Sequence, residues 1–195
     1  MVSSMKNFIL IKLGLRGRNV RIGRNSHIGP FSRIWSPNEL IIGSDFYCGK
    51  FVTVECDGTI GNYVLIANNV GIIGRNDHDH LQIGTPITKS NWVGNHKKLS
   101  SKIKIGNDVW IGFGSILLAP VKIGNHAIVA AGSVVRSDVP DFAIVAGNPS
   151  KIVGWRFGSK TTRKKHADKI GEFILSEQLI DLNKFTKNQK FSSRR

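Results

Sequence analysis

An aliphatic side chain returns at every sixth position between residues 105 and 135, and this period limits the possible folds more than any other feature of the sequence. The positions are Ile105, Ile111, Leu117, Ile123, Val129 and Val135. A small or β-branched residue stands four positions after each of them. An amphipathic helix repeats at three and four residues and a half-buried strand at two, so neither explains the pattern. A six-residue period instead predicts short strands separated by bends, coiled so that the aliphatic residues stack.

The same period runs through the first part of the chain, interrupted by a two-residue insertion at Pro37. Its positions are Ile22, Ile28, Ile34, Ile42, Cys48, Val54, Ile60, Ile66 and Ile72. Gly-Asn pairs such as Gly106-Asn107 suit the bends, because both residues accept backbone angles that other side chains disfavour. At three ladder positions per triangular coil, these residues predict an all-β parallel β-helix of about five coils. Cys48 is a ladder position, which favours a small buried hydrophobe over a disulfide.

The period is lost between Ile72 and Ile105, where residues 75–104 are expected to form a long excursion from one corner of the coil. A long loop of this kind in a compact domain is usually functional or disordered. It carries a polar run from Asn76 to His80, followed by Trp92, a residue that is costly to leave in water and is expected to dock.

Three segments follow from these observations. Residues 1–21 are predicted to cap the coil, residues 22–157 to form the β-helix, and residues 158–195 to form a basic, helical tail. The apolar face expected for the tail helix comprises Ile170, Phe173, Ile174, Leu175, Leu179 and Leu182.

The net charge of +15 is concentrated at the two ends of the chain. Residues 1–24 contain six Lys and Arg and no acid, and residues 151–195 contain twelve against four acids. No cluster of basic and stacking aromatic residues lies between them, so we expect no nucleic-acid partner. The basic ends are expected either to contact an anionic membrane surface or to remain solvated. The longest apolar run near the N-terminus, Phe8 to Ile11, is too short to span a bilayer, and a cytoplasmic location is expected.

The C-terminal half resembles the hexapeptide-repeat acetyltransferases, and the likeness extends over roughly residues 20–157. The motifs that carry it are Val109-Trp110-Ile111-Gly112, Ile123-Gly124, Ala130-Ala131-Gly132-Ser133-Val134-Val135, Asp138-Val139-Pro140 and Ala146-Gly147-Asn148-Pro149-Ser150-Lys151. The resemblance implies a left-handed coil, a homotrimer, and acetyl-CoA bound as acyl donor between neighbouring subunits.

In that family a histidine near the start of the excursion acts as the general base, and the matching residue here is His78. Its role agrees with elementary chemistry, because a hydroxyl attacks a thioester poorly until a positioned base accepts its proton, and imidazole titrates near neutral pH. His80 is the alternative base, and Asp77 or Asp79 is expected to orient the imidazole.

The resemblance also implies a set of cofactor-binding residues. Trp110 matches the aromatic residue that contacts the CoA arm, although a surface tryptophan covering the ladder is the alternative. Ala131 matches a small residue beside the pantetheine arm, and Lys151 matches the basic residue that meets the adenosine phosphates. Arg136 stands where many members have a Thr-Lys pair, which keeps the charge with altered geometry. Gly112 and Ser133 complete the expected set.

The leading hypothesis is therefore an acetyl-CoA-dependent O-acetyltransferase that modifies a sugar hydroxyl, as in bacterial surface-polysaccharide biosynthesis. No exposed Cys or Ser stands out as a covalent nucleophile, so direct transfer in a ternary complex is expected. The alternatives are N-acetylation of an amino-sugar nucleotide and acetylation of a small antibiotic. Less favoured are a γ-carbonic-anhydrase-like metal enzyme, for which the histidine spacing is wrong, and a non-catalytic scaffold. No metal is expected.

Overall fold

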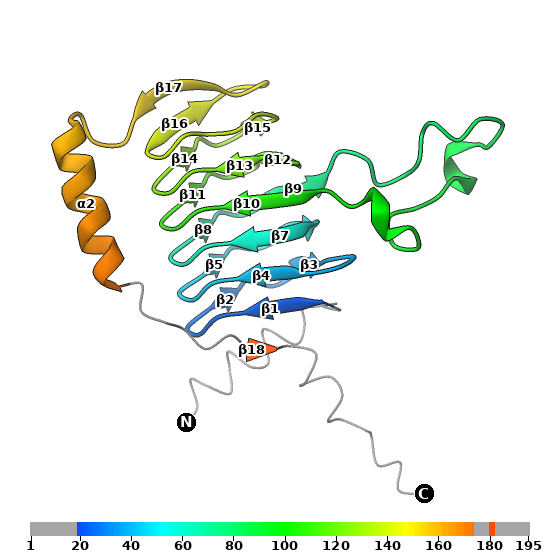
Figure 1. Cartoon of the computed structure of the whole chain (residues 1–195), viewed down its shortest axis with the longest axis horizontal. Helices are drawn as coiled ribbons and strands as arrows, with labels where there is room; N and C mark the ends of the chain where they lie inside the picture. The colour runs from blue at the N-terminus through cyan, green and yellow to red at the C-terminus, as the bar shows by residue number, and fades with distance from the viewer. Residues whose placement is uncertain (1–18, 174–179, 182–195) are drawn as a thin grey trace, which may run out of the picture.

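The computed structural model describes residues 19–173 and 180–181, and the chain winds there through three parallel sheets that form the sides of a triangular coil (Figure 1). The first sheet contains β1 (Val20–Ile22), β4 (Leu40–Ile42), β7 (Asp57–Ile60), β10 (Lys102–Ile105) and β13 (Lys122–Ile123). The second contains β2 (His27–Ile28), β5 (Tyr47–Cys48), β8 (Leu65–Ile66), β11 (Trp110–Ile111), β14 (Ile128–Val129) and β16 (Ala143–Ala146). The third contains β3 (Arg33–Trp35), β6 (Thr53–Glu55), β9 (Gly71–Gly74), β12 (Ile116–Ala119) and β15 (Val134–Val135).

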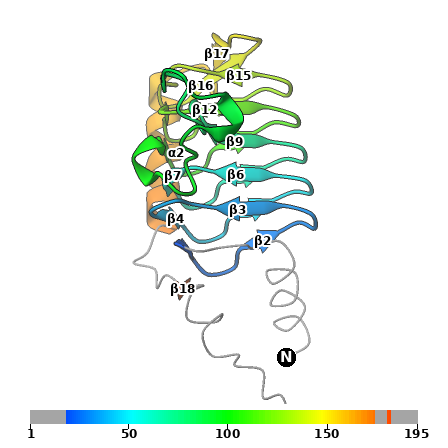
Figure 2. The same ribbon diagram turned by 90° about the vertical axis from the view of Figure 1, so that its right-hand side faces the viewer.

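The coil is left-handed, as expected. In Figure 1 the strands of the first sheet face the viewer and run to the left while the chain climbs from β1 to β16. Figure 2 shows the third sheet from its outer side, with the same upward progression from β3 to β15. The predicted parallel β-helix is therefore confirmed.

The fifteen ladder residues stack in register and form the core. Ile42 pairs with Ile60, Ile111 with Val129, and Leu117 with Val135. All fifteen predicted ladder positions are buried, with at most 2% of each side chain's surface exposed. Stacking of this kind buries the apolar side of each coil against the next.

The coil is slightly longer than the predicted five turns, because six parallel strands stack in the second sheet. The additional strand is β16, where Val145 pairs with Val129. The six-residue period does not reach β16, since Val139, only four residues after Val135, already pairs with Ile123 on the first side of the coil. An early bend thus hides the last rung from a search for period six.

The expected left-handed angles occur at some of the glycine and asparagine residues of the bends, such as Asn25 (φ 54°) and Gly132 (φ 68°). In the Gly-Asn pairs the roles differ, because the left-handed angles there fall on the following residues, Asp108 (φ 52°) and His126 (φ 61°), and not on Gly106. Gly106 is needed because a Cβ there would lie 2.7 Å from the backbone nitrogen of Asn125. The Asn125 side chain in turn accepts a 2.9 Å hydrogen bond from the Asn107 backbone. Glycine therefore provides close approach, and asparagine links one rung to the next.

The excursion spans residues 75–101, because β10 begins at Lys102, before the predicted boundary at 104. Lys102 and Lys104 point outwards while Ile103 and Ile105 are buried, so the strand alternates with period two and its start escapes a six-residue pattern. The excursion contains the short 3-10 helices η1 (Ile87–Lys89) and η2 (Lys97–Leu99). It projects from the corner between the third and first sheets (Figure 1).

The chain leaves the coil through β17 (Lys151–Trp155), which pairs antiparallel with β16, and the helix α2 (Lys160–Phe173) runs beside the coil (Figure 1). Ser159 caps this helix by accepting a hydrogen bond from the Thr162 backbone. The helix lies earlier in the chain than the predicted apolar face, most of which falls outside the described residues. Most of the N-terminal cap also falls outside them, whereas residues 151–173 of the basic C-terminal end are described. β18 (Ile180–Asp181) pairs antiparallel with β1. None of the helices in the described ranges is long and apolar enough to cross a bilayer.

Candidate active site

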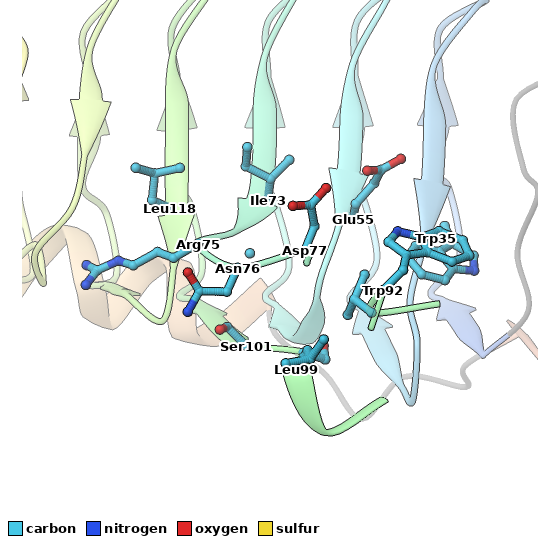
Figure 3. Close-up of a pocket in the computed structure, with 13 residues that line it drawn as sticks. Trp35, Glu55, Ile73, Arg75, Asn76, Asp77, Trp92, Leu99, Ser101 and Leu118 are labelled. Atoms are coloured by element: carbon cyan, nitrogen blue, oxygen red, sulfur yellow. The ribbon is translucent and has the colours of Figure 1, made fainter. Parts of the chain in front are cut away.

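A cleft of about 240 Å³ lies where the excursion meets the coil (Figure 3). Its walls come from the third sheet, from the first residues of the excursion and from the segment that returns to β10. The lining residues are Trp35, Glu55, Ile73, Gly74, Arg75, Asn76, Asp77, Trp92, Val93, Leu99, Ser100, Ser101 and Leu118. The cleft therefore combines two indole rings with two carboxylates and one guanidinium.

His78, the predicted base, lies beside this cleft on a short antiparallel ladder inside the excursion. Asp79 donates a 2.8 Å backbone hydrogen bond to Asn91, and Val93 donates one of 2.7 Å to Asp77. These two bonds flank His78 and Trp92, which stand directly opposite each other. In such a non-hydrogen-bonded pair the side chains are close and point to the same side. The ladder thus fixes His78 next to Trp92.

The imidazole of His78 faces a carboxylate on one nitrogen. Its Nδ1 lies 3.3 Å from Oδ1 of Asp77, and 32% of the His78 side chain is exposed. A carboxylate at Nδ1 favours the tautomer in which Nε2 carries the lone pair. That arrangement makes Nε2 the nitrogen able to accept a proton.

His80 is placed differently. Its side chain is exposed, and it has no hydrogen bond or ion pair with any residue of the described ranges. Asp79, the other acid considered as an orienting group, accepts a hydrogen bond from the backbone of Leu81 in its own turn. These contacts favour His78 with Asp77 over His80 with Asp79.

Asp57 anchors the end of the excursion to the coil. Its buried carboxylate accepts hydrogen bonds from Ser36 (2.6 Å) and from the Asn38 backbone (2.8 Å) and amide (2.6 Å). The same Asn38 amide also donates to the carbonyl of Lys97 in η2. Burial alone would raise the pKa of Asp57, but the hydrogen bonds from Asn38 and Ser36 outweigh it and hold this pKa below its ordinary value.

The predicted cofactor residues do not gather in one place on the single chain. Trp110 lies on the outer face of the second sheet with 52% of its surface exposed, and Lys151 is exposed at the start of β17. Ala131 is exposed at the corner between the second and third sheets. Arg136 follows β15 at the corner where the excursion leaves, and its carbonyl accepts a hydrogen bond from the guanidinium of Arg75. Of the predicted set, only Arg136 therefore lies at the corner from which the excursion leaves.

The two remaining members of the predicted set are inside the coil. Gly112 is buried, and a Cβ there would stand 2.5 Å from the backbone nitrogen of Ala131. Ser133 is fully buried, and its hydroxyl donates a 2.6 Å hydrogen bond to the carbonyl of Ala130. Both residues shape the bend that carries Ala131.

Neither cysteine is placed to act as a nucleophile. Both are buried, and burial raises the pKa of the Cys48 thiol to about 11 and that of Cys56 to about 12. A thiol with such a pKa holds almost no thiolate at neutral pH.

A second cluster of titratable groups was not predicted. Oδ2 of Asp108 lies 3.0 Å from Nδ1 of His126, 2.8 Å from Nε2 of His166 and 2.7 Å from the guanidinium of Arg156. The two histidines and the carboxylate have the chemistry of a metal site, but Arg156 already supplies a cation to the same oxygen. Burial alone would raise the pKa of Asp108, yet hydrogen bonds from His126 and His166 and the charge of Arg156 lower it to about 2. The cluster ties α2 to the coil, and no spacing in the sequence relates residues so far apart.

Comparison with known proteins identifies the repeats. Residues 102–137 match the family model described as bacterial transferase hexapeptide, six repeats. No curated protein sequence matches the chain.

The coil is similar to several solved structures. A galactoside acetyltransferase in complex with coenzyme A shares 22% identity at a TM-score of 0.57, over 78% of this chain and 70% of that chain. AntD, an N-acyltransferase from Bacillus cereus in complex with dTDP and 3-hydroxybutyryl-CoA, shares 18% at a TM-score of 0.57, over 89% and 96%. A hexapeptide-repeat acetyltransferase from Vibrio cholerae in complex with acetyl-CoA shares 21% at a TM-score of 0.50, over 80% and 79%.

At these identities the likeness concerns the fold. Residues 102–137 are bacterial transferase hexapeptide repeats, and they form part of a left-handed β-helix of the kind found in these acyltransferases.

Proposed function

We propose that the chain is an acetyl-CoA-dependent O-acetyltransferase that acts on a sugar hydroxyl, with His78 as the general base. The observation that carries the proposal is the placement of His78 beside a polar cleft, opposite the lining residue Trp92, with Asp77 on one ring nitrogen and the other nitrogen able to accept a proton. A base of this kind typically contributes about 10²- to 10⁴-fold to the rate. The hexapeptide repeats and the acyltransferase fold support the same reaction class.

The reaction needs no covalent intermediate on the protein. The acceptor hydroxyl transfers its proton to Nε2 of His78 while its oxygen forms a bond to the thioester carbonyl carbon. Collapse of the tetrahedral species breaks the carbon–sulfur bond, and the thiolate of CoA leaves and takes the proton from Nε2 of the His78 imidazolium. Asp77 stabilises the imidazolium that forms in between.

Three copies of the chain would complete the site. The excursion leaves from the corner opposite the second sheet, so Trp110 and His78 lie on different sides of one coil. The outer face of the second sheet and its corner with the third carry exposed apolar side chains, which are expected to be covered in a homotrimer. They are Phe31, Tyr47, Phe51, Leu65, Trp110 and Phe113. A neighbouring copy on this face would bring its own excursion towards Trp110.

The acyl donor would then lie between copies. Trp110 offers an indole face to the CoA arm, Ala131 leaves room beside it, and Lys151 and Arg136 offer charge to its phosphates. The role proposed for Gly112 and Ser133 is to hold the bend against which the arm rests. We propose a surface polysaccharide or its precursor as the acceptor that supplies the sugar hydroxyl.

Two assays test this proposal. The first measures protection against thermal unfolding by acetyl-CoA in the native protein, in Trp110→Ala and in the control Trp155→Ala. We expect acetyl-CoA to raise the Tm of the native protein and of Trp155→Ala, and to have little effect on the Tm of Trp110→Ala. The second measures thiol release from acetyl-CoA with neutral sugars, amino sugars and sugar nucleotides.

Release only with hydroxyl acceptors supports O-acetylation. Thiol release only with an amino-sugar nucleotide would contradict O-acetylation and indicate N-acetylation instead. Absence of both protection and thiol release would contradict the acetyltransferase assignment.

A further inference from the structure

Two tryptophans from distant parts of the chain form a stacked pair at one end of the cleft (Figure 3). The rings of Trp35 on β3 and Trp92 in the excursion are nearly parallel, at 8°, with centroids 6.0 Å apart. Parallel rings in contact are separated by about 3.5–4 Å, so these rings are offset and leave part of their faces uncovered. Trp92 keeps 40% of its surface exposed. The pair therefore offers an aromatic surface to the solvent inside the cleft.

The position of the Trp92 ring is built into the backbone. A Cβ on Gly94 would lie 2.0 Å from the ring, so only glycine at that position lets the indole lie where it does. The antiparallel ladder that flanks Trp92 also holds His78 directly opposite. The aromatic surface and the base are thus fixed relative to each other.

Two carboxylates stand beside the aromatic surface. Glu55 on β6 is the register partner of Trp35. The carboxylate of Asp77 stands at the centre of the cleft, on the side of Glu55 (Figure 3). Two cations lie near these carboxylates: Arg33 pairs with Oε1 of Glu55 at 3.1 Å, and Arg75 donates a hydrogen bond to the carbonyl of Arg136. Oε2 of Glu55 and Oδ2 of Asp77 are the oxygens left to accept further hydrogen bonds.

We propose that the Trp35–Trp92 pair holds the pyranose ring of the acceptor, with Glu55 and Asp77 accepting its hydroxyl hydrogens, and that the acceptor ring is neutral. A pyranose has an apolar face of C–H groups and a rim of hydroxyls, which matches an aromatic surface bordered by acceptors. Arg33 offsets the charge of Glu55, and the side chain of Arg75 points away from the tryptophans (Figure 3). The carboxylate of a uronic acid would therefore meet chiefly that of Asp77, and like charges at this range repel. The ring would lie beside His78, so one of its hydroxyls reaches the base. This assignment depends on the proposed function, because it identifies the acceptor subsite of that reaction.

Direct binding tests the subsite without the acyl donor. Tryptophan fluorescence of the full chain is titrated with methyl pyranosides of galactose, glucose, mannose and N-acetylglucosamine, and with methyl glucuronide as the anionic match. We expect at least one neutral glycoside to change the emission saturably and methyl glucuronide to bind about tenfold more weakly. Trp35→Ala and Trp92→Ala should lose the change, and Trp155→Ala, which removes a half-exposed tryptophan of β17, should keep it.

Kinetics then separate binding from positioning. With any accepted sugar, Trp92→Ala and Trp35→Ala are expected to raise the acceptor KM about tenfold, while Trp92→Phe restores most of it. The KM for acetyl-CoA and its thermal protection should stay at the native values. An unchanged acceptor KM with a lower kcat would overturn the subsite and leave the pair as a support for His78.

Failure of the subsite differs from failure of the proposed function. If no neutral glycoside binds while acetyl-CoA still protects the protein, the subsite is wrong and the acetyltransferase assignment stands. If glycosides bind but neither protection nor transfer occurs, the aromatic subsite stands and the assignment does not.

Discussion

In the coil the core contacts of the ladder residues recur from rung to rung, whereas in the excursion each contact occurs once. The ladder residues stack in register from Ile22 to Val145, and any one of them has equivalent neighbours. Of residues 75–101, by contrast, only Ser90 and Val93 are buried. The excursion is held by the hydrogen bond from Asn38, which Asp57 positions, to Lys97, by the Trp35–Trp92 stack and by the short ladder at His78. Stability is thus expected to reside in the repeated part and specificity in the unique part.

The largest expected effect comes from breaking the ladder. Ile111 is fully buried between Ile66 and Val129, so Ile111→Ala should lower the free energy of unfolding by about 3–4 kcal/mol because it leaves a cavity. Ile83→Ala, at a residue of the excursion that is 99% exposed, should change it by less than about 0.5 kcal/mol. Urea denaturation measures both, and equal losses would mean that the excursion shares the core.

Removing Asp57 should detach the excursion. Asp57→Ala leaves the donors of Ser36 and Asn38 unpaired, and we expect a loss of about 3 kcal/mol. Cleavage by trypsin at Lys97 and Lys98 should also accelerate, because Asn38 no longer holds η2. Asp57→Asn, which keeps an acceptor oxygen, should lose less. An excursion as resistant to trypsin as in the native protein would contradict the anchoring role.

Asp108 makes the docking of α2 depend on pH. Its pKa of about 2 in the folded protein lies below the ordinary value, so its contribution is present above about pH 4 and is lost as the pH falls towards 2. The difference corresponds to roughly 2 kcal/mol. The free energy of unfolding of the native protein should therefore exceed that of Asp108→Asn by this amount at pH 5, and the two should converge near pH 2. A difference independent of pH would exclude the charge as its cause.

The smallest effect on stability is expected at Gly94. Gly94→Ala would push the Trp92 ring from its place, because the new Cβ would overlap it. We expect less than about 1 kcal/mol of destabilisation, since the site is outside the core, together with an acceptor KM several-fold higher. Gly158→Ala, where a Cβ meets nothing within 4 Å, is the control for both measurements. Native affinity in Gly94→Ala would show that the ring position does not matter.

The same contrast explains what the sequence could predict. The coil and its buried positions follow from a period that needs no knowledge of distant contacts. The sequence missed only its last rung, after the early bend at Val139, and the first residues of β10. His78 was found because it resembles a family residue at the same place on the excursion, and its role as the base stays a prediction.

The contacts that were not predicted join residues with no common period. Trp35 meets Trp92 only because the excursion folds back on β3, and His126 meets His166 only because α2 docks at the same corner. Each pairing depends on the path of a segment outside the repeat. Sequence patterns that describe one rung at a time contain no information about such a path.

The most direct test of the account is the rate of acetyl transfer by the native protein, His78→Ala and His80→Ala with the same acceptor and acetyl-CoA. The account predicts that His78→Ala loses about two orders of magnitude or more in kcat/KM while acetyl-CoA still protects it against unfolding, and that His80→Ala stays near the native rate. A full rate in His78→Ala, or a loss confined to His80→Ala, would contradict the assignment of His78 as the base.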